Sequence, residues 1–191
     1  MHSFKCGASV LDFIGTLRAR RNEVPTEMLI SPESLEAWFR ESGLVDADTP
    51  CEPLDLQRAI ALREAVYQLV VATLAGDDYD AEALAVVNDT ARTPSAVPQL
   101  VRRGYRRVEA APQQALSSIA RQAVQLLGGP DAALLKECSR GECTQIYLDR
   151  SHGNRREWCA MDPCGNRIKA AAYRARKRTE ARAVSPERSR K

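Results

Sequence analysis

The stretch CSRGECTQIYLDRSHGNRREWCAMDPCGNRIKAAAYRARKR, residues 138–178, decides how the C-terminal part of the chain folds. It contains four of the six cysteines and leads directly into an arginine-rich segment. The cysteines form two pairs, Cys138-x4-Cys143 and Cys159-x4-Cys164, separated by fifteen residues. Two such pairs, brought together by a hairpin, can surround one tetrahedral Zn²⁺. The spacing therefore predicts one structural Zn²⁺ held by these four thiolates, with no open position for catalysis.

The residues around the cysteines fit such a site. The segment TQIYLD between the pairs alternates polar and apolar residues, which is typical of a strand. Gly141 and Gly165 lack a Cβ and would let backbone N–H groups approach the sulfurs. His152 could replace one cysteine as a ligand, but a solvent-facing position is the favoured interpretation. Cys6 and Cys51 have no paired neighbour, and we expect them to be buried as apolar residues.

A helix beginning at Asn166 would continue from the last cysteine and present several basic side chains. Helical spacing places an apolar stripe, expected to rest on the zinc site, at Ile168, Ala172, Ala175 and Thr179. An arginine stripe beside it consists of Arg167, Arg174 and Arg178. A second basic flank consists of Lys169 and Arg176. Residues 136–191 carry a net charge of +8 and the remaining residues −5, so this end favours an anionic partner. The alternative is a solvated basic helix without a partner.

The first 135 residues have mainly helical patterns. The apolar residues of ASVLDFIGTLRARR, including Leu17, recur at helical spacing. In SPESLEAWFRESG, Ser31 is an expected N-cap and Trp38 an expected core residue. A long helix in DLQRAIALREAVYQLVVATLAG, with Arg63 on its inward stripe, should end at Gly76. DAEALAVVNDTA and PQQALSSIARQAVQLL predict two more helices.

The segment between these last two helices predicts a short hairpin, residues 100–108, interrupted by Gly104. Its arginines are interpreted as a solvated strand face, although a second nucleic-acid patch is an alternative; they are Arg102, Arg103, Arg106 and Arg107. The Gly-Gly-Pro sequence at 128–130 marks a candidate domain boundary. We therefore predict a mainly α N-terminal domain with a small β-hairpin (α+β), residues 1–130. A four-cysteine zinc-finger module ending in a basic helix, 136–180, and a disordered basic tail, 181–191, follow.

Composition narrows the class of protein. The chain has 191 residues, of which 44% are hydrophobic, and this is enough for one ordinary domain and a small module. No apolar run approaches the roughly 20 residues of a membrane helix, and residues 1–15 lack the pattern of a signal peptide. We expect a cytoplasmic protein with no membrane association. Only two histidines, no Ser-His-Asp spacing and no phosphate-binding glycine loop argue against an enzyme.

The phrase WCAMDPCGNR, residues 158–167, followed by KAAAYRARKR, resembles the CGNR zinc-finger family. The resemblance extends through Cys138, Cys143, the YLDRS segment, Arg155 and Arg156. The N-terminal part is similar to the ABATE domain, the usual partner of that finger, through LDFIGTLRAR, SPESLEAWFRESGL, DLQRAIALREAVYQL and NDTA. Gly15 departs from the family pattern, in which many relatives have Asn. The resemblance implies a bacterial transcription regulator with a DNA-binding finger.

The sequence thus predicts a zinc-dependent DNA-binding regulator with double-stranded DNA as partner. The predicted nucleic-acid-binding residues are Arg155, Arg156, Arg167, Lys169, Arg174, Arg176, Lys177 and Arg178. The N-terminal domain would sense a signal, such as a small-molecule effector, or pair protomers into a homodimer. The alternative is a protein that binds or sequesters a small molecule, with a finger that is incidental or RNA-directed.

Overall fold

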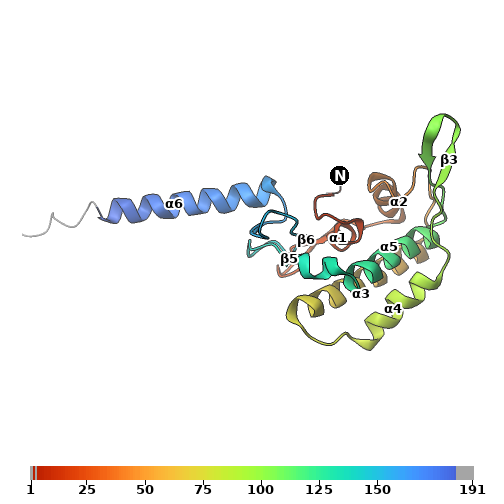
Figure 1. The fold of residues 1–191 in the computed structure, drawn as a ribbon, viewed down its shortest axis with the longest axis horizontal. Coiled ribbons are helices and arrows are strands. Elements are labelled where there is room, and N and C mark those ends of the chain that lie inside the picture. Colours follow the sequence, from red (N-terminus) through yellow and green to blue (C-terminus); the bar gives the residue numbers. More distant parts are fainter. Residues whose placement is uncertain (1, 3, 184–191) are drawn as a thin grey trace, which may run out of the picture.

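The computed structural model describes residue 2 and residues 4–183, and this part of the chain is mainly helical (Figure 1). The helices lie in this order: α1 (Ser9–Ile14), α2 (Pro32–Glu41), α3 (Pro53–Ala75), α4 (Ala81–Arg92), α5 (Pro112–Leu127) and α6 (Asn166–Ala183). Short antiparallel strand pairs lie between them: β1 (Leu17–Arg18) with β2 (Thr26–Glu27), β3 (Gln99–Val101) with β4 (Tyr105–Arg107), and β5 (Leu135–Glu137) with β6 (Ile146–Leu148). Short helical turns complete the order: η1 (Arg102–Gly104), η2 (Pro130–Leu134) and η3 (Met161–Gly165). The predicted fold class, a mainly α body followed by a four-cysteine module and a basic helix, is confirmed.

Local signals set the limits of most helices. The N–H of Ser34 donates to Ser31 Oγ at 3.4 Å, which caps α2 as its sequence predicts. Gly76 ends α3 with a φ of 75°, a left-handed conformation that glycine adopts without a Cβ clash. Pro112 stands at the start of α5, where its missing N–H costs no helical hydrogen bond.

Helix α1 is shorter than the apolar spacing predicts, because it ends at Ile14 and Leu17 lies in β1. A side chain from the cysteine module contacts the backbone at this helix end. Gln145 Nε2 donates to the carbonyl oxygen of Gly15 at 2.9 Å, and a Cβ on residue 15 would lie 2.3 Å from Gln145 Oε1. Gly15 therefore makes room for a side chain 130 residues away.

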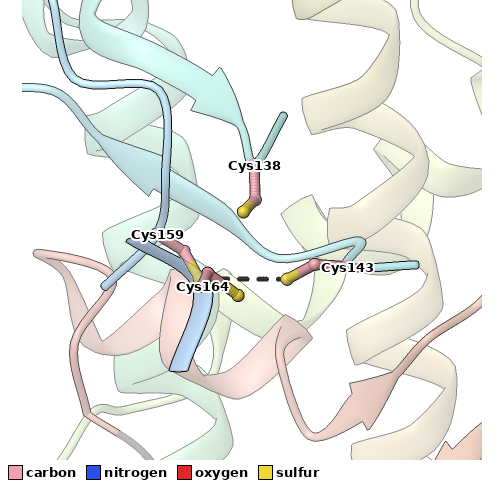
Figure 2. A group of neighbouring side chains, drawn as sticks. All are labelled: Cys138, Cys143, Cys159 and Cys164. Atoms are coloured by element: carbon pink, nitrogen blue, oxygen red, sulfur yellow. Dashed lines mark hydrogen bonds between the residues drawn. The ribbon is translucent and has the colours of Figure 1, made fainter. Parts of the chain in front are cut away.

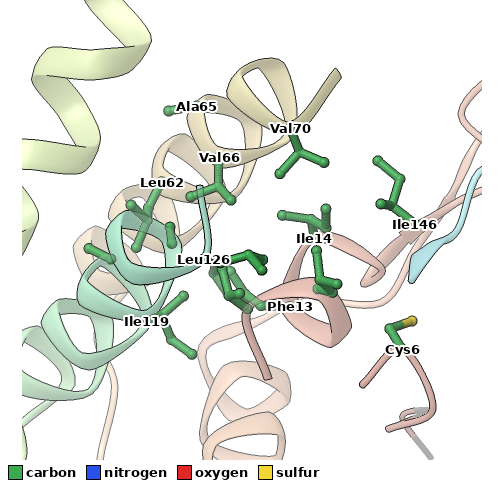
Figure 3. Packing of buried hydrophobic residues seen from close by; sticks show 14 of the residues in the cluster. Cys6, Phe13, Ile14, Leu62, Ala65, Val66, Val70, Ile119, Leu126 and Ile146 are labelled. Carbon is green, nitrogen blue, oxygen red and sulfur yellow. The ribbon is translucent and has the colours of Figure 1, made fainter. Parts of the chain in front are cut away.

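The hydrophobic core lies between α1, α3 and α5 and includes Phe13, Val66 and Ile119 (Figure 3). Trp38 is fully buried, as predicted. The same core contains residues from the cysteine module, namely Leu135, Cys138, Ile146, Tyr147, Leu148, Cys159 and Cys164. The module is therefore packed on the body through a shared core. The division of the chain into domains at residues 1–130 and 136–180 stays a prediction.

The predicted hairpin is confirmed by β3 and β4, which pair Gln99 with Arg107 and Val101 with Tyr105. It projects from the end of the body that joins α4 to α5 (Figure 1). The predicted tail lies outside the described residues, except that 181–183 continue α6. Among the described residues, no helix combines the length and the hydropathy needed to cross a bilayer.

Candidate metal centre and basic helix

The two cysteine pairs converge on one point (Figure 2). Cys138 follows β5 and Cys143 precedes β6, and the N–H of Cys138 donates to the carbonyl oxygen of Gln145 at 3.0 Å to close the hairpin between them. Cys159 and Cys164 approach from the segment that leads into α6. The four Sγ atoms all lie within 4.8 Å of one another.

This geometry fits a zinc ion. Tetrahedral zinc with Zn–S bonds of about 2.3 Å places its sulfurs about 3.8 Å apart. Cys143 Sγ and Cys159 Sγ lie 3.8 Å apart. Cys138, Cys159 and Cys164 are buried, Cys143 is half-buried, and all four are free thiols rather than disulfides. The mutual hydrogen bond of Cys143 and Cys159 lowers the pKa of the Cys143 thiol and raises the pKa of the Cys159 thiol, so Cys143 is the first of the pair to form the thiolate that a metal requires.

Positive charge and backbone turns support the sulfurs. Arg140 Nη1 lies 3.8 Å from Cys164 Sγ, where its charge offsets part of the negative charge of a four-thiolate site. The N–H of Cys143 donates to the carbonyl oxygen of Arg140 at 2.7 Å and closes the first cysteine turn. The N–H of Gly165 itself does not point at a sulfur, because it donates to the carbonyl oxygen of Ala160 at 3.0 Å.

Gly165 instead makes room for an aromatic ring at the root of α6. A Cβ on residue 165 would lie 2.8 Å from Trp158 Nε1, so only glycine fits beneath this ring without movement. Lys169 Nζ lies 5.4 Å from the centre of the same ring, on its face. Gly141 is different, because a Cβ there would meet no heavy atom within 4 Å. The close approach expected at both glycines therefore occurs only at Gly165.

Helix α6 begins at Asn166, two residues after the last cysteine, and extends away from the body (Figure 1). Every residue from Lys169 to Glu180 is exposed. Arg167 is also exposed, so the basic residues expected along the helix all face solvent. The apolar stripe does not rest on the metal site as expected: only Ile168 is half-buried, because the helix leaves the module after its first turn.

The structure separates Arg155 from Arg156. Arg155 is exposed. Arg156 faces inward, where its Nε donates to the carbonyl oxygen of Trp158 at 2.6 Å and its Nη2 to that of Cys159. Its guanidinium also lies over the ring of Tyr147, with 4.5 Å to the centroid. The Arg156 side chain is therefore engaged inside the module, which differs from its expected exposure to nucleic acid.

Sequence reasoning missed Asp149, which is fully buried at the end of β6. Its carboxylate accepts hydrogen bonds from the N–H and Oγ of Ser151, the N–H of Arg156 and Nζ of Lys136. Burial raises the pKa of Asp149, but these hydrogen bonds outweigh it and hold the pKa below its usual range. An Asp followed two residues later by Ser is a turn signal that could have identified it.

A cavity of about 270 Å³ lies where the cysteine module meets the body. Cys143, Cys159 and Cys164 line it on one side, and Arg18 and Asn22 on the other. Because three of the four cysteines border it, this space belongs in part to the metal site. His152 is exposed, as favoured, and takes no part in the cysteine cluster.

Comparison with known families gives two matches. Residues 7–130 match ABATE, described as "Putative stress-induced transcription regulator", and residues 135–177 match the CGNR zinc finger. No curated protein matches the chain. The four-cysteine cluster within that finger is the site of one structural Zn²⁺. Because the first match covers well over half of the 191 residues, the chain belongs to the ABATE family and carries a C-terminal CGNR zinc finger.

Proposed function

We propose that the chain is a zinc-dependent regulator whose helix α6 binds double-stranded DNA. The observation that carries the proposal is the form of α6, an exposed basic helix whose first turn is held by the zinc site. Residues 166–180 include six basic side chains against Glu180 alone. A helix that projects from a fixed root can enter a major groove or follow phosphates without moving the body.

The distribution of charge supports the same partner. The segment 136–191 is net positive and the remaining chain is net negative. DNA would therefore attract α6 and repel the body, so binding energy should depend almost wholly on the helix. The helical body would then be free to sense a signal or to pair protomers.

The two basic faces of α6 suggest two kinds of contact. Arg167, Arg174 and Arg178 share one stripe, which we assign to the groove. Lys169 and Arg176 lie on the other flank and are assigned to phosphates. Lys177 and Arg155 would add phosphate contacts near these faces, although Lys177 Nζ already lies 3.2 Å from Glu180. Arg156 is left out of this set because its guanidinium is engaged within the module.

The test is a duplex-binding titration across salt concentrations with Arg174→Ala and Arg176→Ala, after zinc content has been checked. Loss of one phosphate contact should reduce the slope of log affinity against log salt by about one. An arginine that reads a base should instead cost about 1–3 kcal/mol at its own base pair and leave other sequences nearly unchanged.

Arg92→Ala is the matched control, because Arg92 is 77% exposed but lies on α4 in the body. It should bind as wild type does. Wild-type affinity in both α6 variants would make the helix a solvated basic face. Wild-type protein that binds no duplex at low salt would favour small-molecule binding by the body instead.

A further inference from the structure

The β3–β4 hairpin is an exposed arm that the zinc site and α6 do not use. Both strands are exposed along their whole length, and Leu100 and Tyr105 are 82% and 68% exposed. A two-stranded hairpin with no third strand or covering helix is marginal in water. Large apolar side chains on such an arm indicate a protein partner, because their burial would stabilise both surfaces.

The base of the arm is held to the body while its tip is free. The N–H of Asp46 donates to the carbonyl oxygen of Val108 at 2.8 Å, and the N–H of Val108 donates to Asp46 Oδ2 at 2.8 Å. Arg106 Nη2 donates to the carbonyl oxygen of Gly43 at 3.0 Å. Arg102, at the tip, has no ion-pair partner among the residues that the structure describes. The arm is therefore presented in a fixed direction with a free positive charge at its end.

The arm connects α4 to α5, and a complementary surface lies at the far ends of these two helices. An apolar groove of about 190 Å³ is formed by α3, α4 and α5, with Leu84, Val87 and Val124 among its lining residues. Val124 is 45% exposed. The loop that follows α3 carries Asp77 and Asp78, both exposed and without an ion pair among the described side chains. An apolar and acidic surface thus stands opposite an apolar and basic arm.

We propose that the arm of one chain docks into this groove of a second copy. The arm joins the end of α4 to the start of α5, and the groove lies towards the start of α4 and the end of α5. If two copies lie with these helices antiparallel, each arm meets the partner's groove and the contact closes on itself as a two-fold dimer. Leu100 would enter the groove, whereas Tyr105 pairs with Val101 and lies on the opposite face of the arm. Arg102 would face Asp78.

This dimer goes beyond the proposed contact of α6 with DNA and does not depend on it. The arm and groove belong to the helical body, whereas α6 leaves the molecule from the cysteine module (Figure 1). A dimer would carry two basic helices, so a DNA-binding chain would engage two sites at once. Its test is made without DNA, and therefore its failure is distinguishable from failure of the proposed function.

The experiment is sedimentation equilibrium of zinc-loaded full-length protein over a wide concentration range. Wild type should dimerise, and Leu100→Glu and Val124→Glu should each raise the dimer dissociation constant at least about tenfold. Ile30→Glu is the matched control, because Ile30 is 76% exposed outside the arm and the groove. It should leave the constant unchanged.

Charge reversal tests the pairing itself. Arg102→Glu and Asp78→Arg should each weaken the dimer, and the double variant should bind itself more tightly than either single variant. Monomeric wild type at every concentration would overturn the proposal. So would a Leu100→Glu protein that dimerises as tightly as Ile30→Glu.

Discussion

Gly165 and Gly141 accompany the two cysteine pairs, but only Gly165 lies against a side chain. A Cβ on residue 165 would lie 2.8 Å from Trp158 Nε1 and 3.0 Å from Met161 Sδ. Gly165→Ala should therefore cost about 1–3 kcal/mol, because the half-buried Trp158 ring must move from its place at the root of α6. Thermal unfolding followed by circular dichroism, together with the zinc content of the purified protein, measures this effect.

Gly141→Ala is the matched control for that substitution. It places the same methyl group in open space on the other cysteine turn and should change stability by less than about 0.5 kcal/mol. Equal losses in the two variants would mean that both turns need glycine for their backbone rather than for space. Comparison of Gly165→Ala with Gly141→Ala therefore separates a steric clash of the added methyl group from a loss of backbone conformational freedom.

At the scale of the element, Arg63 joins the long helix α3 to the first strands. The side chain is 2% exposed, and its Nη1 and Nη2 donate to Glu27 Oε1 and Oε2 at 2.6 and 2.7 Å. Nη1 also donates to Thr16 Oγ1 at 3.2 Å, just beyond α1. A charge on the inward face of a helix is therefore matched by partners from β2 and from the end of α1.

Arg63→Ala should destabilise the protein by about 3–5 kcal/mol, because it leaves Glu27 without its buried partner. Burial raises the pKa of Glu27, but the hydrogen bonds from Arg63 and the backbone outweigh it and lower the pKa. The stabilisation is therefore present above the usual Glu pKa of about 4.3 and is lost as pH falls through the lower folded-state value. Urea denaturation at several pH values measures it.

Arg58→Ala provides the comparison on the same helix. Arg58 is 51% exposed and lies 3.8 Å from Asp55, so its loss should change stability by less than about 1 kcal/mol. If the two variants unfolded at the same urea concentration, the buried pair would contribute no more than a surface one. Burial of the arginine within the helix would then add nothing to its contribution to the free energy of unfolding.

At the scale of the whole molecule, the zinc site and the helical body stabilise each other. Leu135, Tyr147 and Leu148 belong to the core that the body also uses, and the N–H of Leu148 donates to the carbonyl oxygen of Cys6 at 2.8 Å. Arg21 Nη2 lies 2.6 Å from Glu137 Oε1 across the same boundary. The cysteine module therefore contributes to the fold beyond its own forty residues or so.

Removal of zinc by a chelator should release α6 and loosen the module, and Cys143→Ser or Cys164→Ser should do the same. The body should stay folded but melt at a lower temperature, by about 2–4 °C for each kcal/mol lost from the shared core. Hydrogen exchange resolved along the chain distinguishes the two parts. An unchanged melting temperature of the body would show that the module is only tethered to it.

The sequence by itself determined the features that depend on neighbouring residues. Ser31 caps α2, Gly76 ends α3, and Gly104 interrupts the hairpin, because each of these signals acts within a few residues. The two cysteine pairs were also readable, since a tight turn supplies two ligands and needs only a second turn nearby. The start of α6 at Asn166 was predictable for the same reason, because it directly follows the second cysteine pair.

The tertiary structure alone decided which way these elements face and where they end. Gln145 donates a hydrogen bond to the Gly15 carbonyl at the end of α1 from 130 residues away. Arg156 turns inward to the carbonyl groups of Trp158 and Cys159 rather than towards solvent. The thin apolar stripe of α6 is left exposed beyond the half-buried Ile168, because the helix leaves the module after its first turn. The packing of the cysteine module on the helical body was likewise decided only by the tertiary structure. Each depends on contacts that form only when distant segments pack, and no local periodicity encodes them.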